Sequence, residues 1–369
     1  MIKILIIDEN NEQRSYLKEV LINSTILDDE IDVYEASNGL EGLKMAQYNE
    51  PNIVILEQQL KEIDGITLCK ELASKKDIPI IFLTAIRDNE IKEQAFRAGA
   101  SDYLIKPTHP YELLIRIKKH YDFYMLQKKL KDTLENYEKD IKIARIVQKG
   151  LLPKNKKNDN VVFDYIYISS HYTSGDMLDV IQLDDDKVFV YVYDISGHGV
   201  TSALLSIIVK QEIEQIIKEE YNLKDIVLKL EKRTKEHFFD GRYFTGIFAI
   251  ISKNEIEYIN IAHREMIFLK NREIEIDSET DFPMGVGLIH KDNLHVHKKK
   301  IDNDTMILLY TDGLLEVKDF DENSLYNLLS NIKNNDPEDI MHTIRTAINL
   351  YLDYNYPNDD ITVLGLKIL

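Results

Sequence analysis

Short apolar runs alternate with amphipathic stretches along the first 120 residues. The runs are rich in β-branched residues and predict five β-strands, at 3–7, 31–36, 52–56, 78–83 and 102–105. Between them, apolar side chains recur with a period of about 3.6 residues, which predicts helices at 12–21 and 89–98. Because parallel strands need crossover helices, this alternation predicts a doubly wound α/β fold around a parallel sheet.

A long helical segment follows, with neither proline nor glycine from Tyr121 to Lys149. Apolar residues recur along it at alternating spacings of four and three, at Leu130, Leu134, Tyr137, Ile141 and Ala144. Lysines and glutamates flank this seam. The pattern favours a parallel dimeric coiled coil, but two heptads also leave open a helix that packs against one of its own domains.

The C-terminal residues are rich in strand signals, and helical stretches lie between them. Strands are predicted at 161–169, 180–183, 188–193, 246–251, 256–261, 266–269, 306–310 and 361–366, and helices at 201–220, 223–237 and 337–352. The hairpin-like spacing indicates antiparallel sheets covered by helices, an α+β β-sandwich. Leu151-Leu152-Pro153 and the polar stretch after it mark a boundary. We therefore expect three parts, at 1–121, 122–150 and 151–369.

Composition narrows the class of protein. The single cysteine, Cys69, cannot form an internal disulfide and fits a reducing compartment. No apolar run approaches the roughly 18 residues of a membrane span. The N-terminus turns acidic after seven residues, which predicts a first strand and not a secretory signal. These features predict a cytoplasmic protein that is not held in a membrane.

The charge of the chain is strongly negative and uneven. The net charge of −18 argues against a general affinity for nucleic acid or anionic lipid. Residues 161–369 contain 37 acidic and 21 basic side chains and so account for −16 of it. Three explanations are open: the segment binds a basic partner, it holds cations among its carboxylates, or its acidic residues are simply solvated on the surface. The positions of the acidic residues distinguish between them.

Polar residues stand at the ends of four strands predicted in the first 120 residues. They are Asp8 and Glu9, then Glu57, Thr84 and Lys106. Functional groups of doubly wound sheets gather beyond the carboxyl ends of the strands. The sequence therefore predicts one crevice that holds three carboxylates, a hydroxyl and an ammonium group.

These positions resemble the response-regulator receiver family, whose fold is flavodoxin-like. Asp8 and Glu9 match the family's magnesium ligands, so the resemblance implies one Mg²⁺ in the receiver. Thr84 matches the phosphate-sensing hydroxyl, Tyr103 the switch aromatic and Lys106 the phosphate-binding lysine.

The phosphoacceptor position departs from this family. Glu57 stands where an aspartate is expected, and Lys61 replaces the proline usual four residues later. The added methylene moves the carboxylate by about 1.5 Å, roughly one C–C bond, and acyl-phosphate formation depends on in-line geometry. Glu57 is therefore either a fixed mimic of the phosphorylated state or a mark of a degenerate module kept for its surfaces.

Four aspartates of the C-terminal part are predicted to stand at strand ends or in the turns just after them. They are Asp176, Asp194, Asp312 and Asp359, and glycines lie next to or near several of them. Converging carboxylates without partners are costly, and hard divalent cations such as Mg²⁺ and Mn²⁺ prefer such oxygens. The full set therefore predicts a metal site.

The order of these motifs resembles that of the type-2C (PPM-type) metal-dependent phosphatases, most closely the bacterial SpoIIE/RsbU-like serine phosphatases. The resemblance runs from about Ala144 to the end of the chain, through ARIVQKGLLP, SGDMLDV, DISGHGVTSALLS, PMG, LLYTDGLLE and DDITV. Ser174, Met177, Leu178 and Ala262 depart from the family pattern, but none of them removes a ligand position.

The resemblance also implies a site and a substrate. Asp194 would bridge two Mn²⁺ or Mg²⁺ ions, Asp312 and Asp359 would complete one site, and Asp176 with the Ile195 carbonyl the other. A two-metal site activates water for in-line attack on phosphorus. The implied substrate is a phosphoserine or phosphothreonine of a protein, in this family an anti-sigma-factor antagonist of a partner-switching pathway. No arginine is marked as a phosphate clamp, and Arg242 is the only candidate that we name.

Two further classes of function compete with the phosphatase hypothesis. One is a catalytically weak scaffold that binds partners through both domains, and the loss of the receiver aspartate shows that such decay is possible in this chain. The four filled ligand positions favour the enzyme. DNA binding is opposed by the net charge and by the lack of a basic recognition element.

Overall fold

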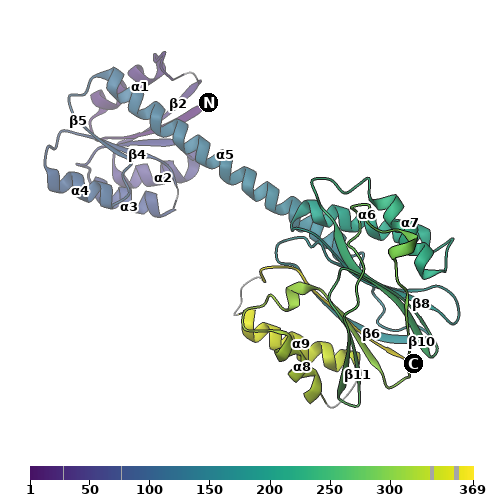
Figure 1. The fold of residues 1–369 in the computed structure, drawn as a ribbon. Helices are drawn as coiled ribbons and strands as arrows, with labels where there is room; N and C mark the ends of the chain where they lie inside the picture. Colours follow the sequence, from purple (N-terminus) through teal and green to yellow (C-terminus); the bar gives the residue numbers. More distant parts are fainter. Residues whose placement is uncertain (28, 76, 333–335, 353–356) are drawn as a thin grey trace. The chain divides into compact units, whose positions relative to one another are not determined.

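The computed structural model describes residues 1–27, 29–75, 77–332, 336–352 and 357–369. The chain divides into two compact units, Met1–Tyr137 and Glu138–Leu369 (Figure 1). Among the described residues, no helix combines the length and the apolar character needed to span a bilayer.

The first unit is built on a five-stranded parallel sheet. Its strands are β1 (Ile2–Ile7), β2 (Ile31–Ala36), β3 (Ile53–Leu56), β4 (Ile80–Thr84) and β5 (Asp102–Ile105), in the order β2-β1-β3-β4-β5. The connecting helices are α1 (Asn11–Ile22), α2 (Gly39–Asn49), α3 (Gly65–Lys75) and α4 (Asn89–Arg97). The doubly wound α/β fold predicted from the alternating pattern is confirmed.

Two apolar cores fill the two faces of this sheet. Leu17 and Leu21 of α1 pack on one face with Ile117, and Leu68 and Ala95 of the opposite helices pack on the other. The inner strands β1, β3 and β4 are buried on both faces, which explains why they are nearly continuous apolar runs, whereas the edge strand β2 is only partly buried.

Helix α5 (Pro110–Lys149) continues without a break from the first unit into the second. It begins at a proline, whose fixed φ suits the first helical turn. Ile117 and Tyr121 are buried in the first unit. Between Tyr121 and the end of the first unit at Tyr137, five large apolar side chains are 54% to 65% exposed: Phe123, Leu126, Leu130, Leu134 and Tyr137. The predicted linker 122–150 falls on this helix and the residue that follows it.

The second unit contains two antiparallel sheets of five strands. One has the order β13-β10-β9-β8-β7, from β7 (Met177–Gln182), β8 (Val188–Ile195), β9 (Phe244–Ser252), β10 (Glu255–Ile261) and β13 (His297–Lys300). The other has the order β12-β11-β14-β15-β6, from β6 (Val161–Ile168), β11 (Met266–Lys270), β12 (Glu273–Asp277), β14 (Met306–Tyr310) and β15 (Ile361–Ile368).

Helices cover the outer faces of this sandwich. α6 (Val200–Ile216) and α7 (Leu223–Thr234) pack on the first sheet, and α8 (Glu322–Asn331) and α9 (Pro337–Leu352) pack on the second (Figure 1). Tyr191, Phe248 and Leu364 belong to the apolar core shared by both sheets. The predicted α+β sandwich flanked by helices is confirmed.

Candidate active site

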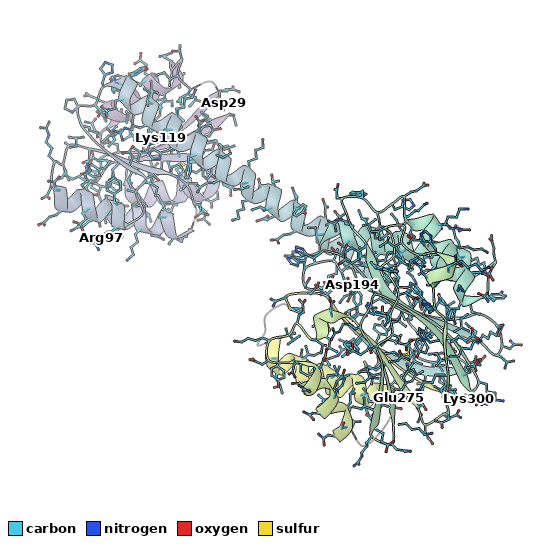
Figure 2. The ribbon with its side chains drawn as sticks, in the orientation of Figure 1. Asp29, Arg97, Lys119, Asp194, Glu275 and Lys300 are labelled. Carbon is cyan, nitrogen blue, oxygen red and sulfur yellow. The ribbon has the colours of Figure 1, made fainter. Side chains whose placement is uncertain are left out.

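Four aspartates from the strand ends of both sheets meet at one end of the sandwich. Asp176 directly precedes β7, and Asp194 lies in β8, where the two sheets face each other (Figure 2). Asp312 begins a short 3-10 turn after β14, and Asp359 lies two residues before β15. Carboxylate oxygens of Asp312, Asp359 and Glu316 all lie within 4.8 Å of one another.

The Asp176 loop packs directly on the strand that carries Asp194. A Cβ atom at Gly175 would lie 2.8 Å from the Ile195 carbonyl oxygen and 3.4 Å from Asp194 Oδ1. A side chain at Gly175 would therefore collide with the backbone of β8, and glycine is what permits the close approach. The structure thus brings together Asp176, Asp194 and the Ile195 carbonyl.

The carboxylates perturb one another strongly. Burial, followed by the negative charge of Asp312, raises the pKa of Asp194 to about 7. Burial, followed by the charge of Asp194, raises the pKa of Asp176 well above its usual range. Burial also raises the pKa of Asp359, with a contribution from Asp312. The cluster is an unfavourable arrangement of like charges unless protons or cations offset them.

One carboxylate oxygen of the cluster is left without a hydrogen-bond partner among the described residues. Asp176 Oδ2 accepts a hydrogen bond from Thr311 Oγ1 at 2.9 Å, whereas Asp176 Oδ1 is buried and has no hydrogen-bond partner among the described residues. Buried carboxylate oxygens are normally paired. A set of carboxylates and one backbone carbonyl is the oxygen-rich donor set that Mg²⁺ and Mn²⁺ prefer, so the residues present fit divalent cations.

Two acidic residues of this site were not singled out from the sequence. Asp360 is buried and accepts hydrogen bonds from Ser170 N at 2.7 Å, Ser170 Oγ at 2.9 Å and Gly175 N at 2.8 Å. It thereby ties the Asp176 loop to β15. The Asp-Asp doublet before a strand was the signal for Asp360, and the spacing of four from Asp312 was the signal for Glu316.

Basic and imidazole groups lie around the same loops. Arg242 Nη1 donates to Ser196 O at 3.0 Å and to Ser202 Oγ at 3.1 Å, so it braces the turn after Asp194. The exposed His198 stacks on His171, with ring centroids 4.7 Å apart.

His263 lies apart from the exposed imidazoles. Its Nδ1 lies 2.8 Å from Thr245 Oγ1, its backbone N donates to Asn260 Oδ1 at 2.9 Å, and burial lowers its pKa to about 4.

A second cluster lies at the carboxyl ends of the strands in the first unit. Lys106 Nζ lies 2.6 Å from Asp8 Oδ2 and 2.7 Å from Glu57 Oε2. Glu57 Oε1 accepts from Gln58 N at 2.7 Å, and Asp8 Oδ1 accepts from Asn10 N at 2.8 Å. Lys106 thus provides a counter-charge to both carboxylates, so this arrangement does not favour the magnesium ion that the resemblance implies.

The other predicted receiver residues surround this ion pair. Glu9 accepts a hydrogen bond from the backbone of Lys61, the residue that replaces the expected proline. Thr84 is buried, and its Oγ1 accepts from Ile86 N at 3.3 Å. Tyr103 is buried as well, and its hydroxyl donates to Ile86 O at 3.1 Å. Thr84 and Tyr103 therefore meet at Ile86 and not at Glu57.

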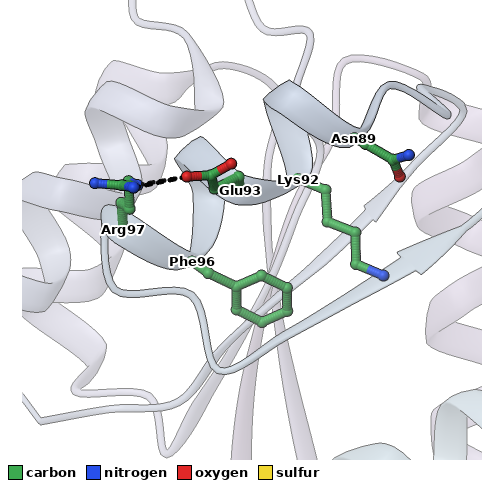
Figure 3. Close-up of a pocket in the computed structure, with 5 residues that line it drawn as sticks. All are labelled: Asn89, Lys92, Glu93, Phe96 and Arg97. Carbon is green, nitrogen blue, oxygen red and sulfur yellow. Dashed lines mark hydrogen bonds and ion pairs between the residues drawn. The ribbon is translucent and has the colours of Figure 1, made fainter.

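A shallow hollow on α4 is separate from both clusters. It is lined by Asn89, Lys92, Glu93, Phe96 and Arg97 (Figure 3). Glu93 and Arg97 form an ion pair at 2.7 Å beside the half-exposed Phe96 ring. None of the residues predicted from the sequence lines this surface.

Comparison with known proteins separates the same two regions. A family model described as stage II sporulation protein E (SpoIIE) matches residues 184–369, and one described as response regulator receiver domain matches residues 4–118. The transcriptional regulatory protein SrrA of Staphylococcus aureus is 35% identical over 116 residues, which cover 31% of this chain and 46% of SrrA. The chain thus spans about half the length of the curated relatives it matches.

Solved structures resemble the second unit. The SiaA PP2C domain of Pseudomonas aeruginosa matches with a TM-score of 0.57 at 14% identity, over 64% of this chain and 98% of that chain. The PP2C phosphatase domain of the cell fate determinant SpoIIE from Bacillus subtilis, with a fragment of its regulatory domain, matches with a TM-score of 0.51 at 17% identity, over 56% of this chain and 61% of that chain. At these identities the likeness concerns the fold.

Proposed function

Because the chain belongs to the SpoIIE family, we propose that it is a metal-dependent protein serine/threonine phosphatase regulated through its receiver domain. The meeting of four aspartates carries this proposal, since one of their buried oxygens, Asp176 Oδ1, has no hydrogen-bond partner among the described residues. A scaffold without catalysis would gain nothing from such mutually repelling carboxylates.

The proposed substrate is a protein that carries phosphoserine or phosphothreonine. Its identity as an anti-sigma-factor antagonist of a partner-switching pathway rests on the resemblance of the motifs between Ala144 and the C-terminus. The net charge of −18 supports a protein substrate over nucleic acid.

In this proposal Asp194 would contribute to both of two Mn²⁺ or Mg²⁺ sites. Asp312 and Asp359, with Glu316 beside them, would hold one cation, and Asp176 and the Ile195 carbonyl would hold the other. When bound, the two cations would supply Lewis acidity for the attack of water on the phosphoryl group.

The chain's own residues hold the carboxylates of this site in place. Thr311 orients Asp176, and Asp360 fixes the Gly175 backbone. Arg242 braces the turn that follows Asp194.

Hydrolysis of a phosphoserine peptide by the full chain tests the proposed function. We expect turnover with Mn²⁺ or Mg²⁺, complete inhibition by EDTA, and recovery when the cation is restored, because the carboxylates need a counter-charge to bind a phosphate. Released phosphate is the quantity to measure. Turnover that persists in fully chelated protein would exclude the metal-dependent mechanism, and no turnover with any divalent cation would favour the scaffold alternative.

We further propose that the chain forms a homodimer through α5. The exposed apolar side chains from Phe123 to Tyr137 continue the seam predicted from the sequence toward the receiver, with Phe123 in its heptad register and Leu126 one residue before the next expected position. A contiguous exposed apolar stripe on a helix is typical of a pairing surface. Ile141 and Ala144 continue the stripe and are partly buried.

The ion pair between Glu57 and Lys106 supports the hypothesis that Glu57 mimics a phosphorylated acceptor. We expect small-molecule phosphodonors to leave no acyl-phosphate on the wild-type protein, since the carboxylate is displaced and already paired. Glu57→Gln keeps the size and removes the charge, so phosphatase activity should change by about fivefold, a typical coupling between two sites. Phosphate release and phosphoprotein mass spectrometry are the measurements.

The matched control for this experiment is a carboxylate that forms an ion pair away from the crevice. Glu35 is unsuitable, because it pairs with Arg14, whose Nη1 donates to the Asp8 carbonyl. Glu71→Gln takes its place: Glu71 forms an ion pair with Lys75 at 2.7 Å on the surface of α3, so activity should stay at the wild-type level. Unchanged turnover and dimerisation in both Glu57→Gln and Lys106→Ala would instead assign the module to docking.

A further inference from the structure

Gln148, in the last turn of α5, is a buried polar residue that the proposed chemistry does not use. Its side chain is 1% exposed. Nε2 donates to Ser174 O at 2.6 Å, and Oε1 accepts from Ser174 N at 3.0 Å, so one amide group binds both backbone groups of one residue. Nε2 also lies 3.2 Å from Ser206 Oγ in α6.

Ser174 in turn forms a hydrogen bond with Asp176. Its Oγ accepts from Asp176 N at 3.1 Å, so the residue held by Gln148 in turn holds the backbone of the proposed ligand. The next residue, Gly175, is the one that packs on Asp194 and Ile195. Ser174 is also a position where the sequence departs from the family pattern, and its hydroxyl supplies a contact that glycine could not.

From these contacts we infer that Gln148 is a positioning residue of the metal site, and this inference rests on the proposed function. It holds the Ser174-Gly175 segment so that Asp176 and the Ile195 carbonyl can bind the same cation. Asp360 holds the segment from its other side through Gly175 N. The amide of Gln148 is matched to this role, since a carboxylate could not donate to Ser174 O and an apolar side chain could make neither bond.

Gln148→Leu and Gln148→Glu in the full chain test this inference. Both keep the approximate size of the side chain. Residues that orient metal ligands typically change metal affinity by 10 to 100-fold, so we expect the Kd for Mn²⁺, measured by electron paramagnetic resonance, to rise about tenfold or more in Gln148→Leu. In metal-free protein, amide hydrogen exchange in a peptide that covers 170–177 should become faster. The phosphatase activity of Gln148→Leu should be closer to the wild-type level at saturating Mn²⁺ than at limiting Mn²⁺.

Gln182→Leu is the matched control. Gln182 lies at the other end of β7, and its Nε2 also donates to turn backbone, at Asp184 O. It should leave the Mn²⁺ affinity and the exchange at 170–177 unchanged. Wild-type Mn²⁺ affinity and exchange in a folded Gln148→Leu protein would overturn the inference. If that variant does not fold, the same two measurements on Gln148→Glu decide the question.

The exchange measurement separates the two proposals. Because it needs no metal, it tests the hold of Gln148 on the loop even if the wild-type protein binds no Mn²⁺, which would refute the proposed function alone.

Discussion

Asp194→Asn should lower phosphatase turnover by about 1000-fold or more while the protein remains folded. Because Asp194 is proposed to contribute to both cation sites, no single neighbour can replace its charge. A roughly 1000-fold loss of turnover corresponds to about 4 kcal/mol of lost transition-state stabilisation. The substitution keeps the size of the side chain. Initial rates on a phosphoserine peptide at saturating Mn²⁺ are the measurement.

The same variant should not unfold the metal-free protein. The pKa of Asp194 is raised to about 7, chiefly by burial and by the charge of Asp312. A carboxyl group with a raised folded pKa stabilises the fold below its unfolded pKa, and this contribution is lost as the pH rises through about 7. Asn removes the charge that causes the loss, so Tm without metal at pH 8 should equal or exceed that of the wild type.

Asp164→Asn is a suitable control for turnover. Asp164 is also buried, in β6, where it pairs with Lys156 at 2.7 Å away from the cluster. Its substitution should leave turnover near the wild-type level. If Asp194→Asn keeps more than a tenth of the activity, the two-cation arrangement is wrong.

Charged substitutions in the α5 seam should have the second largest effect. The wild-type chain should sediment as a dimer at micromolar concentration, and Leu134→Glu with Ile141→Glu should give monomers. Burial of a leucine contributes about 1.5–3 kcal/mol, and each position counts twice in a symmetric dimer, so the dimer Kd should rise by about 100-fold or more. Sedimentation velocity is the measurement.

Ile146→Glu controls for a general effect of charge on the helix. Ile146 is 70% exposed and lies on the side of α5 away from the seam, so this variant should remain dimeric. A wild-type chain that sediments as a monomer would contradict the dimer and return the helix to a role within one chain.

The fold was largely predictable because its strands are buried apolar runs. β1, β8 and β14 lie within one or two residues of the predicted ranges. The edge strands β12 (EIEID) and β13 (HKKK) were missed, because edge strands expose polar side chains and lack an apolar run.

The helices show the same limit of sequence patterns. α8 was missed because its ten residues carry few buried positions, Leu325 and Leu329 among them. The heptad pattern predicted the second half of α5, from Leu130 onward. The first half was not predicted by this pattern, because its apolar residues, such as Ile117 and Tyr121, pack in the core of the receiver.

The candidate site was only partly predictable. Position in a motif identified the four aspartates, because their residue type and order are typical of one chemistry. Nothing in the sequence shows that the Gln148 amide reaches Ser174, 26 residues later, because that contact depends on how α5 packs on the sandwich. Asp360 was missed because it lies directly beside Asp359, which was already assigned as the metal ligand of this motif.

The unbroken course of α5 fixes the phase of the helix but leaves its length free. Tyr137, Ile141, Ala144 and Gln148 follow one another at intervals of four, three and four, so the seam and the amide that holds the Asp176 loop share one side of the helix. An insertion of seven residues after Tyr137 would rotate the two segments by only about 20°. An insertion of two residues would rotate the two segments by about 160°, so that the seam and the Gln148 side chain would lie on opposite sides of the helix. If α5 pairs as proposed, variants of this chain can therefore lengthen by whole heptads and keep both the dimer contact and the Gln148 contact, whereas a change of two residues must lose one of them.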